Sequence, residues 1–272
     1  MNVAYLGPDG SYSSQAARRR FGDDACFVPQ RTIDAVFDAV HRSECRFGIV
    51  PVENTTDGRI IDTMVGLTRY PVSVVAEVEL SVRHALLARG GIDSVQEVHS
   101  KQQAISQCRE WLARTLPNAT LCPAESTTAA ALLAAERDDV AAIAPEEFAT
   151  VCGLRVVATK IQDDPENRTR FLVLSEKTEQ PSLPTGRDRS IVLLKLPHRC
   201  GALADALGIF RVFEISLSRI ESFPVRGMAN LYWFYIEFDG HRDSPQCHAV
   251  LETLRLFATQ MILPGSFDTG EN

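Results

Sequence analysis

Short apolar runs alternate with helical stretches through the first two-thirds of this chain. Each apolar run is short enough to be a buried strand, and several helical stretches begin at a Ser or Thr that can act as an N-cap. The predicted strands are residues 3–6, 47–52, 72–80, 119–121, 140–143, 155–158 and 171–174. The predicted helices are residues 13–21, 32–41, 60–68, 101–116, 126–137 and 146–151. This alternation predicts an α/β fold with mostly parallel strands.

Two long crossings divide this α/β region into two lobes. Residues 72–87 form an apolar crossing, and residues 154–174 form the return. We therefore expect a two-lobed domain over residues 1–176, with a cleft between the lobes. One lobe would contain about residues 1–76 plus 160–176, and the other would contain residues 77–159.

The pattern changes after a polar stretch that contains Pro181 and Pro184, which predicts a linker over residues 177–188. Beyond it, strands are predicted at 190–196, 215–223, 231–238 and 261–263. Helices are predicted at 201–210 and 244–259, the second with Ser244 as N-cap and Pro245 in its first turn. The order βαββαβ predicts a small ferredoxin-like domain over residues 189–272.

Composition narrows the class of protein. Hydrophobic residues make up 45% and charged residues 23% of the 272, as in ordinary globular proteins, and no apolar run is long enough to cross a bilayer. The start at Met1 shows no targeting signal, so we expect a cytoplasmic protein. The seven cysteines form no CxxC pair, which favours reduced thiols over disulfides or zinc. With a net charge of −7 and its basic residues interspersed, the sequence does not indicate a basic surface for binding nucleic acid.

Polar side chains gather where predicted strands end. The stretch 165–174 is polar at its start, where Asn167, Thr169 and Arg170 offer an amide, a hydroxyl and a guanidinium, and apolar at its end. Three further loops, at 7–14, 50–58 and 125–128, are rich in hydroxyl groups. Each loop alone is as well explained by helix capping. Because ligands of open α/β folds bind at strand ends, the set together predicts a pocket for a small polycarboxylate.

Several kinds of site are not supported by the sequence. There is no GxGxxG after a predicted strand, no GxxxxGK[ST], no GxSxG and no HExxH. The six histidines form no close pair of the kind that binds zinc. We therefore expect neither a cofactor nor a metal.

Eight segments together resemble one family, in that family's order. They are YLGPDGSY at 5–12, GIVPVENT at 48–55, SKQQA at 100–104, STTA at 126–129, AAIA at 141–144, NRTRF at 167–171, GALADAL at 201–207 and IESFP at 220–224. Over nearly its whole length the chain resembles prephenate dehydratases that carry a C-terminal ACT regulatory domain.

The resemblance implies a fold, a reaction and partners. It implies a two-lobed catalytic domain like a type II periplasmic binding protein, closing on prephenate, and a ferredoxin-like ACT domain that binds phenylalanine as an effector. Prephenate would lose carbon dioxide and its ring hydroxyl to give phenylpyruvate, without a cofactor. A homodimer or homotetramer is expected. The alternatives are an arogenate dehydratase, a prephenate decarboxylase that does not aromatise the ring, and a non-catalytic sensor of an amino acid or anion.

The resemblance also implies residue roles. Thr169 would donate a hydrogen bond to the leaving hydroxyl, Arg170 would orient its loop or meet a carboxylate, and Phe171 would fix the strand. Glu53 would be either a second proton-transfer group or a structural partner of an arginine. The expected substrate-binding residues are Ser11, Asn54, Thr55, Ser100, Lys101, Gln103, Ser126, Thr127, Thr128 and Asn167. The expected effector-binding residues are Gly201, Ala202, Leu203, Glu221, Ser222, Phe223 and Pro224.

Two of the departures from the family pattern bear on these roles. Lys101 stands where histidine is usual, so a permanent cation would attract a carboxylate there. Phe223 stands where arginine is usual, which bears on phenylalanine sensitivity. No helical segment precedes Val3, so we expect no fused chorismate mutase.

Overall fold

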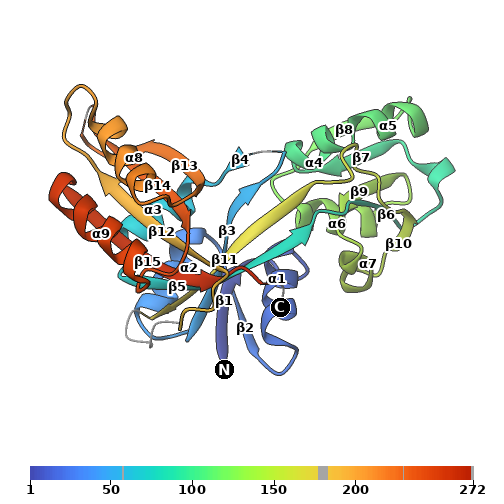
Figure 1. Cartoon of the computed structure of the whole chain (residues 1–272). Helices are drawn as coiled ribbons and strands as arrows, with labels where there is room; N and C mark the ends of the chain where they lie inside the picture. The colour runs from blue at the N-terminus through green and yellow to red at the C-terminus, as the bar shows by residue number, and fades with distance from the viewer. Residues whose placement is uncertain (57, 177–182, 229, 271–272) are drawn as a thin grey trace.

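The computed structural model describes residues 1–56, 58–176, 183–228 and 230–270, and it contains three sheets. The first two sheets form the two lobes of residues 1–176, and the third forms a C-terminal domain (Figure 1). Each lobe sheet has helices on its faces, as expected for an α/β protein. The predicted two-lobed fold class is confirmed.

The first lobe is built on the sheet order β2-β1-β3-β11-β5. Its strands are β1 (Asn2–Leu6), β2 (Cys26–Gln30), β3 (Phe47–Asn54), β5 (Val72–Ser81) and β11 (Arg168–Glu176), and β4 (Gly58–Arg59) pairs with β3. Its helices are α1 (Tyr12–Phe21), α2 (Ile33–His41) and α3 (Ile61–Arg69). Residues of α1 pack on one face of the sheet, and residues of α2 and α3 pack on the other.

The second lobe is built on the sheet order β10-β6-β9-β7-β8. Its strands are β6 (Ala85–Ala88), β7 (Glu97–Ser100), β8 (Thr120–Pro123), β9 (Val140–Ala144) and β10 (Arg155–Ala158). Its α-helices are α4 (Gln102–Gln107), α5 (Arg109–Thr115), α6 (Thr127–Glu136) and α7 (Glu147–Cys152), and η1 (Ile92–Ser94) is a short 3-10 helix. The helices α4 and α5 cover one face, and α6 and α7 cover the other.

The expectation of mostly parallel strands was wrong, because both lobe sheets are mixed. β1 runs parallel to β2 and β3, whereas β11 runs antiparallel to β3 and β5. The chain leaves the first lobe along β5 and returns along β11, so these neighbours must run in opposite directions. In the second lobe β6 is likewise antiparallel to β9 and β10. The predicted helix 101–116 is divided at Cys108 into α4 and α5.

The C-terminal domain has the predicted order βαββαβ. Its elements are β12 (Asp188–Lys195), α8 (Ala202–Val212), β13 (Leu217–Pro224), β14 (Tyr232–Asp239), α9 (Pro245–Phe257) and β15 (Gln260–Asp268). The strands form an antiparallel sheet in the order β13-β14-β12-β15, with α8 and α9 packed on one face. Of the predicted linker, residues 177–182 lie outside the described residues, and β12 begins at Asp188.

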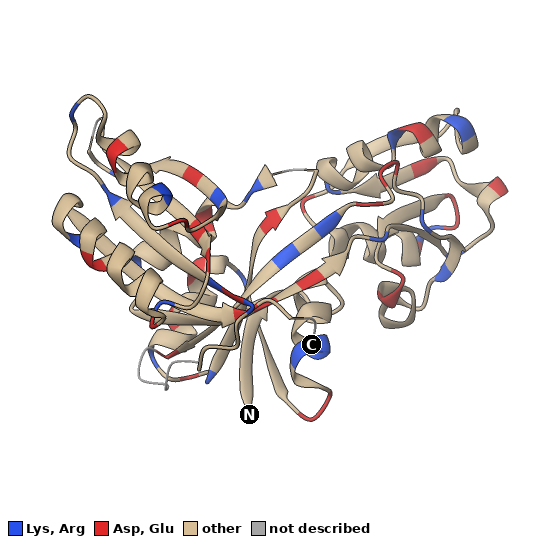
Figure 2. Cartoon of the chain, in the orientation of Figure 1, with Lys and Arg blue, Asp and Glu red and all other residues tan. Residues whose placement is uncertain are grey.

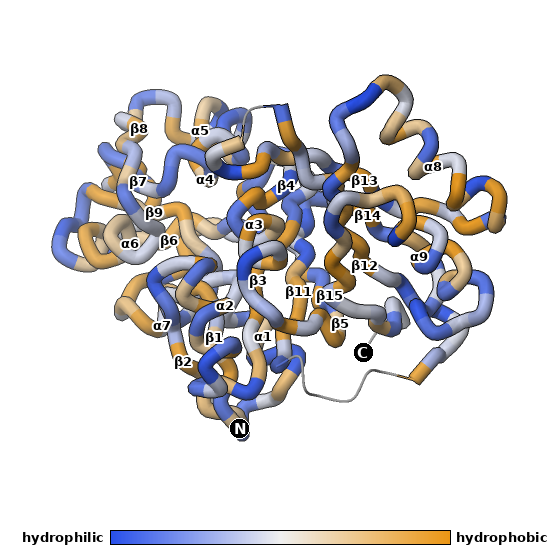
Figure 3. Tube along the Cα trace, turned by 90° about the vertical axis from the view of Figure 1, so that its left-hand side faces the viewer, coloured by the Kyte–Doolittle hydropathy of each residue, from blue (hydrophilic) through white to orange (hydrophobic). Residues whose placement is uncertain are grey.

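The other face of the C-terminal sheet packs against the first lobe. Trp233, Tyr235 and Phe267 belong to the same apolar core as Val72 and Val74 of β5. The strands β5, β12 and β15 lie together near the centre of Figure 3. At Gly265 a Cβ would lie 2.1 Å from the carbonyl oxygen of Val74, so the two backbones touch there. The C-terminal domain is therefore docked directly on the sheet of the first lobe.

Among the described residues, we find no helix with the length and apolar character needed to span a bilayer.

Candidate active site

A cavity of about 800 Å³ lies between the two lobes, within the size range of small-molecule sites. Its wall is formed by the ends of β1 and β3 and the start of β11 from the first lobe, and by the starts of α4 and α6 from the second. Eight predicted site residues line it: Ser11, Asn54, Lys101, Gln103, Ser126, Thr127, Thr169 and Phe171. The predicted cleft and the predicted polar loops thus meet in one place.

Thr169 and Asn54 form a hydrogen-bonded pair in this wall. They are opposite each other on β11 and β3, and Asn54 Nδ2 donates to Thr169 Oγ1 at 2.9 Å. The amide orientation is fixed because Asn54 Oδ1 accepts from the Thr56 N–H at 3.0 Å. Within the described residues the Thr169 hydroxyl donates to no protein acceptor, so its hydrogen can point toward a ligand. The arrangement presents one O–H donor to the cavity.

Two helix starts face the cavity from opposite lobes. Ser11 caps α1, where its hydroxyl accepts from the Ser14 N–H at 3.3 Å, and Ser126 caps α6, where its hydroxyl accepts from the Ala129 N–H at 3.0 Å. Ser11, Ser126 and Thr127 line the cavity. Because helix N-termini carry partial positive charge and free N–H groups, both starts favour an anionic ligand.

Arg31 and Lys101 add formal positive charge to the wall. Neither makes an ion pair with any residue that the structure describes. The wall contains two carboxylates, those of Asp9 and Glu125. Asp9 already has partners, since its Oδ1 accepts from Ser14 Oγ at 2.7 Å and lies 3.3 Å from Arg18 Nη2. The hydrogen bond from Ser14, with help from Arg18, lowers the pKa of Asp9. The two basic side chains can therefore each meet a carboxylate of a ligand.

His84 and Arg31 are cavity residues that sequence reasoning missed. His84 lies at the crossing between the lobes, where its Nε2 is 2.7 Å from Gln107 Oε1 and its Nδ1 is 3.5 Å from the Tyr12 hydroxyl. The histidine has no motif around it, so the sequence carried no signal for this position. Arg31 directly follows β2, which was not predicted because Cys26–Gln30 is half exposed, contains Pro29 and lacks an apolar run.

Four predicted substrate-binding residues lie outside the cavity lining. Asn167 Oδ1 accepts from Asn54 Nδ2 at 2.9 Å, and Thr55 Oγ1 accepts from the Arg168 N–H at 3.0 Å. Ser100 is buried and donates to the carbonyl oxygen of Ile143 at 2.7 Å. Thr128 lies in the first turn of α6, with its hydroxyl buried. Asn167, Thr55 and Ser100 thus hold the wall in place from behind.

Arg170 and Glu53 lie on the opposite side of the sheet from the cavity. Their strands pair them directly, one step from Asn54 and Thr169, and successive residues of a strand point to opposite faces. Arg170 Nη1 donates to Glu237 Oε2 of the C-terminal domain at 2.9 Å, and Glu53 pairs with Arg219 of that domain. Of the two roles expected of Arg170, this geometry favours orientation of its loop over contact with a substrate carboxylate. For Glu53, the geometry supports the structural alternative.

The predicted effector residues do not form one pocket within a single chain. A pocket of about 140 Å³ at the start of α8 is lined by Ala202 and Leu203, next to Gly201. On β13, Glu221 and Phe223 point toward the first lobe, where Glu221 pairs with Arg59 and Phe223 is buried in the shared core. Ser222 and Pro224 are exposed on the other side of that strand. Alternation along β13 thus places the four predicted effector-binding residues of this strand on opposite faces.

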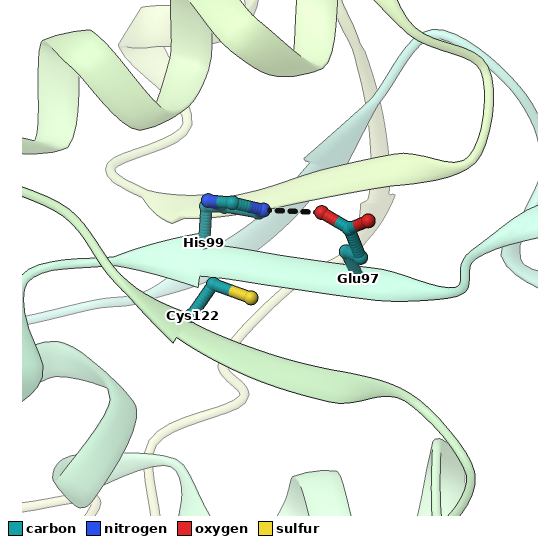
Figure 4. A group of neighbouring side chains, drawn as sticks. All are labelled: Glu97, His99 and Cys122. Carbon is teal, nitrogen blue, oxygen red and sulfur yellow. Dashed lines mark hydrogen bonds and ion pairs between the residues drawn. The ribbon is translucent and has the colours of Figure 1, made fainter.

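Glu97, His99 and Cys122 place three potential metal ligands within 4.8 Å of one another. They come from the paired strands β7 and β8 (Figure 4). Glu97 Oε2 lies 2.8 Å from His99 Nε2, and Glu97 Oε1 accepts from Arg137 Nη2 at 3.0 Å. Because both carboxylate oxygens already have partners, we interpret the group as an ion-pair cluster rather than a metal centre.

Comparison with known proteins identifies the family. The family model "Prephenate dehydratase" matches residues 3–179. The chain is 37% identical to the bifunctional chorismate mutase/prephenate dehydratase of Neisseria gonorrhoeae, over 99% of this chain and 75% of that protein. It is 33% identical to the prephenate dehydratase of Amycolatopsis methanolica, over 97% of this chain and 88% of that protein.

A solved structure has a similar fold over almost the whole chain. The prephenate dehydratase of Arthrobacter aurescens in complex with L-Phe superposes with a TM-score of 0.92 at 29% identity, over 98% of this chain and 90% of that one. The family model covers well over half of the chain, and these relatives match it along almost its whole length. The chain belongs to the prephenate dehydratase family.

Proposed function

We propose that this chain is an enzyme that converts prephenate to phenylpyruvate, carbon dioxide and water, and that phenylalanine regulates it. Family membership gives the reaction class. The observation that carries the proposal is the Thr169 hydroxyl, positioned by Asn54 in a cavity that also presents Arg31 and Lys101. These groups match a substrate with two carboxylates and a ring hydroxyl.

The cavity wall must supply positive groups to the carboxylates of the substrate and a hydrogen-bond donor to its leaving hydroxyl. Arg31, Lys101 and the two helix starts bind the carboxylates, since charge-assisted hydrogen bonds are the strong ones in such sites. Thr169 donates its O–H to the ring hydroxyl as the C–O bond breaks. The bond between the ring and the carboxylate breaks to release carbon dioxide, and its electron pair enters the ring, which becomes aromatic as the C–O bond breaks. The oxygen leaves as hydroxide, hydrogen-bonded to the Thr169 O–H, and takes a proton from solvent water.

Thr169 acts as a hydrogen-bond donor and not as a freely ionising acid, because an alcohol is too weak an acid to protonate a group unaided at neutral pH. Aromatisation supplies much of the driving force. The protein therefore contributes mainly by holding the dianion in a reactive orientation and by stabilising charge on the departing oxygen. Phe171, next along the cavity side of β11, packs the strand against the core of the first lobe.

The C-terminal βαββαβ domain acts as an ACT domain that binds phenylalanine. A relative that superposes with a TM-score of 0.92 was solved in complex with L-Phe, and the pocket beside Ala202 and Leu203 is lined by apolar side chains, by polar side chains that include Arg199, and by the start of α8. Ser222 lies opposite Phe234, a lining residue of that pocket, so the exposed side of β13 continues the surface. β13 is an edge strand, which supports completion of the effector site by a second copy in a homodimer or homotetramer.

A turnover assay tests both parts of this proposal. The purified full chain is mixed with prephenate at neutral pH without added cofactor, phenylpyruvate is followed, and the assay is repeated with phenylalanine and with arogenate. We expect product from prephenate and less product when phenylalanine is present. Product from arogenate alone would reassign the substrate, and no product from either would favour a sensor. Product that phenylalanine leaves unchanged would remove the regulatory part.

Thr169→Val tests the role of the hydroxyl. We expect kcat to fall by about 10²–10⁴-fold while KM changes little, because the lost hydrogen bond is made to the departing oxygen in the transition state. Thr253→Val is the matched control, since Thr253 donates only to the carbonyl oxygen of Ala249 in α9, away from the cavity. A Thr169→Val enzyme with the kcat of the control would remove Thr169 from the mechanism.

A further inference from the structure

Six charged residues, two of them buried and four partly buried, form an ion network where the C-terminal domain meets the first lobe. The first lobe supplies Glu53 from β3, Glu77 from β5 and Arg170 from β11, and the C-terminal domain supplies Arg189, Arg219 and Glu237. Figure 2 shows basic positions along β11 between acidic positions on β3 and β5. Three carboxylates and three guanidinium groups balance, so the network is neutral as a whole.

Each lobe residue of the network has a partner across the domain boundary. Arg170 forms a two-point contact with Glu237, in which Nη1 donates to Oε2 at 2.9 Å and Nη2 donates to Oε1. Glu77 Oε1 is 3.4 Å from Arg189 Nη1, and Glu53 pairs with Arg219. The side chains of Arg170 and Glu237 are only 9% and 1% exposed, so solvent screens their interaction little.

The Arg170–Glu237 pair is the most tightly held of these contacts. The Tyr235 hydroxyl also donates to Glu237 Oε1, and Glu77 Oε2 accepts from Arg170 at 3.1 Å. Burial alone would raise the pKa of Glu237, but the hydrogen bonds and charge of Arg170 outweigh it and hold that pKa below its usual value. Glu237 is therefore ionised at neutral pH, and removing its charge would leave Arg170 without its principal partner.

The network adjoins the reacting group through two consecutive cross-strand pairs. Thr169 pairs with Asn54 on the cavity side of β11 and β3, and the next pair, Arg170 with Glu53, faces the C-terminal domain. Both residues that present the catalytic hydroxyl are thus bonded through the backbone to residues anchored in the other domain. A displacement of β14, which carries Glu237, acts on Arg170 and so on its neighbour Thr169.

We propose that the Arg170–Glu237 pair positions Thr169 and transmits the state of the C-terminal domain to it. Arg170 and Glu237 are positioning residues that act through Thr169, without contact with substrate. No further element is then needed to carry the effect of phenylalanine to the active site. The C-terminal sheet, which carries the effector pocket, contacts β11, the strand that carries the Thr169 hydroxyl. The regulatory half of this inference rests on the proposed function, and the positioning half rests on the geometry of β3 and β11.

Glu237→Gln tests the inference in the full chain, because it removes one charge from the pair without touching the cavity. We expect kcat for prephenate to fall by about tenfold and KM to stay within about twofold. We also expect phenylalanine to raise the melting temperature of the variant, as any ligand of the native state does, while changing its kcat much less than in the wild type. If Glu237 only stabilised the fold, Glu237→Gln would lower the melting temperature but would leave kcat and its response to phenylalanine as in the wild type.

Arg59→Gln is the matched control. It breaks the Arg59–Glu221 ion pair, which crosses the same boundary from β4 to β13 and includes no residue of β11, although Arg59 lies opposite Glu53 in the pairing of β4 with β3. The control should keep the wild-type kcat. Wild-type kcat together with wild-type inhibition in Glu237→Gln would overturn the inference.

Hydrogen exchange separates this inference from the proposed function. In Glu237→Gln, peptides that cover residues 53–55 and 168–171 should exchange faster than in the wild type, whatever the chain turns over. If the wild type does not act on prephenate, the proposed function fails while exchange still decides the positioning role. Unchanged exchange in both peptides would then overturn the positioning role of Arg170 and Glu237.

Discussion

At the scale of single residues, one step along a strand separates chemistry from domain docking. Thr169 and Asn54 present a hydroxyl to the cavity, whereas Arg170 and Glu53, each one residue away, bind the C-terminal domain. Both pairs are polar and adjacent in sequence, so residue type alone does not tell their roles apart. The face of the strand decides between them.

Lys101 gives a prediction at this scale. Lys101→Gln should raise KM for prephenate by about 10–100-fold, because a hydrogen bond to a charged group contributes about 1.5–3 kcal/mol. The effect on kcat should be small, since the carboxylate is bound in both ground state and transition state. Steady-state kinetics checks this, with Lys160→Gln as a control, because Lys160 is exposed and does not line the cavity. Equal KM values in the two variants would place the carboxylates elsewhere.

At the scale of elements, close helix packing shapes the first lobe. Gly66 of α3 lies directly against Phe37 of α2, and a Cβ at this position would be 2.3 Å from the Phe37 ring. Phe37 is fully buried and stacks on Tyr70 with ring centroids 5.7 Å apart, so the ring has no room to retreat. The contact fixes how closely α2 and α3 approach on the side of the sheet opposite α1.

Glycine-to-alanine substitutions at two helical positions should therefore have opposite effects on the free energy of unfolding. Gly66→Ala should lower the free energy of unfolding by about 1–3 kcal/mol, because the added methyl overpacks the helix contact. Gly208→Ala in α8 should raise it by about 0.5–1 kcal/mol, since no atom lies within 4 Å of the new Cβ and alanine favours the helix. Urea denaturation of both variants measures the difference. A stabilising Gly66→Ala would show that the two helices can separate at little cost.

At the scale of the whole molecule, the first lobe and the C-terminal domain share one core. Apolar residues of β5, β12, β14 and β15 pack together, and the ion network lies beside them. The second lobe meets the first at the crossings and around the cavity, where Gln15 of α1 donates to Glu147 of α7 at 3.1 Å. The arrangement couples the C-terminal domain to one wall of the cavity more closely than to the other.

The lowered pKa of Glu237 predicts how acid weakens the contact between the C-terminal domain and the first lobe. A carboxylate with a lowered folded-state pKa contributes stability above its unfolded value of about 4.3, and the contribution is lost as pH falls through the folded-state pKa. The wild type should thus be more stable than Glu237→Gln at pH 7, and the gap should shrink toward pH 3. Arg170, Arg189 and Arg219, the basic groups facing Glu237, stay charged throughout. Urea denaturation at both pH values measures the gap, and a constant gap would show that Glu237 does not stabilise the interface as an anion.

The sequence by itself determined most of the element order and several site residues. Apolar runs and capping residues located most strands and helices, because period and capping are local properties. It missed the strands β2, β4 and β7, and it included β6 only in an apolar crossing. β2 was missed because its half-exposed residues lack an apolar run, and Arg31 was missed with it. It placed Asn54 and Thr169 at strand ends, where both proved to line the cavity.

Only the tertiary structure decided which side of each strand meets which neighbour. Arg170 follows Thr169 in a polar run, and the sequence left open whether it orients its loop or meets a carboxylate. The C-terminal sheet covers its face of β11, so Arg170 makes an interdomain contact. The effector motif on β13 was divided in the same way, with Phe223 turned into the shared core. Alternation within a strand is local, whereas the partner that covers each face is set by contacts between residues far apart in the chain.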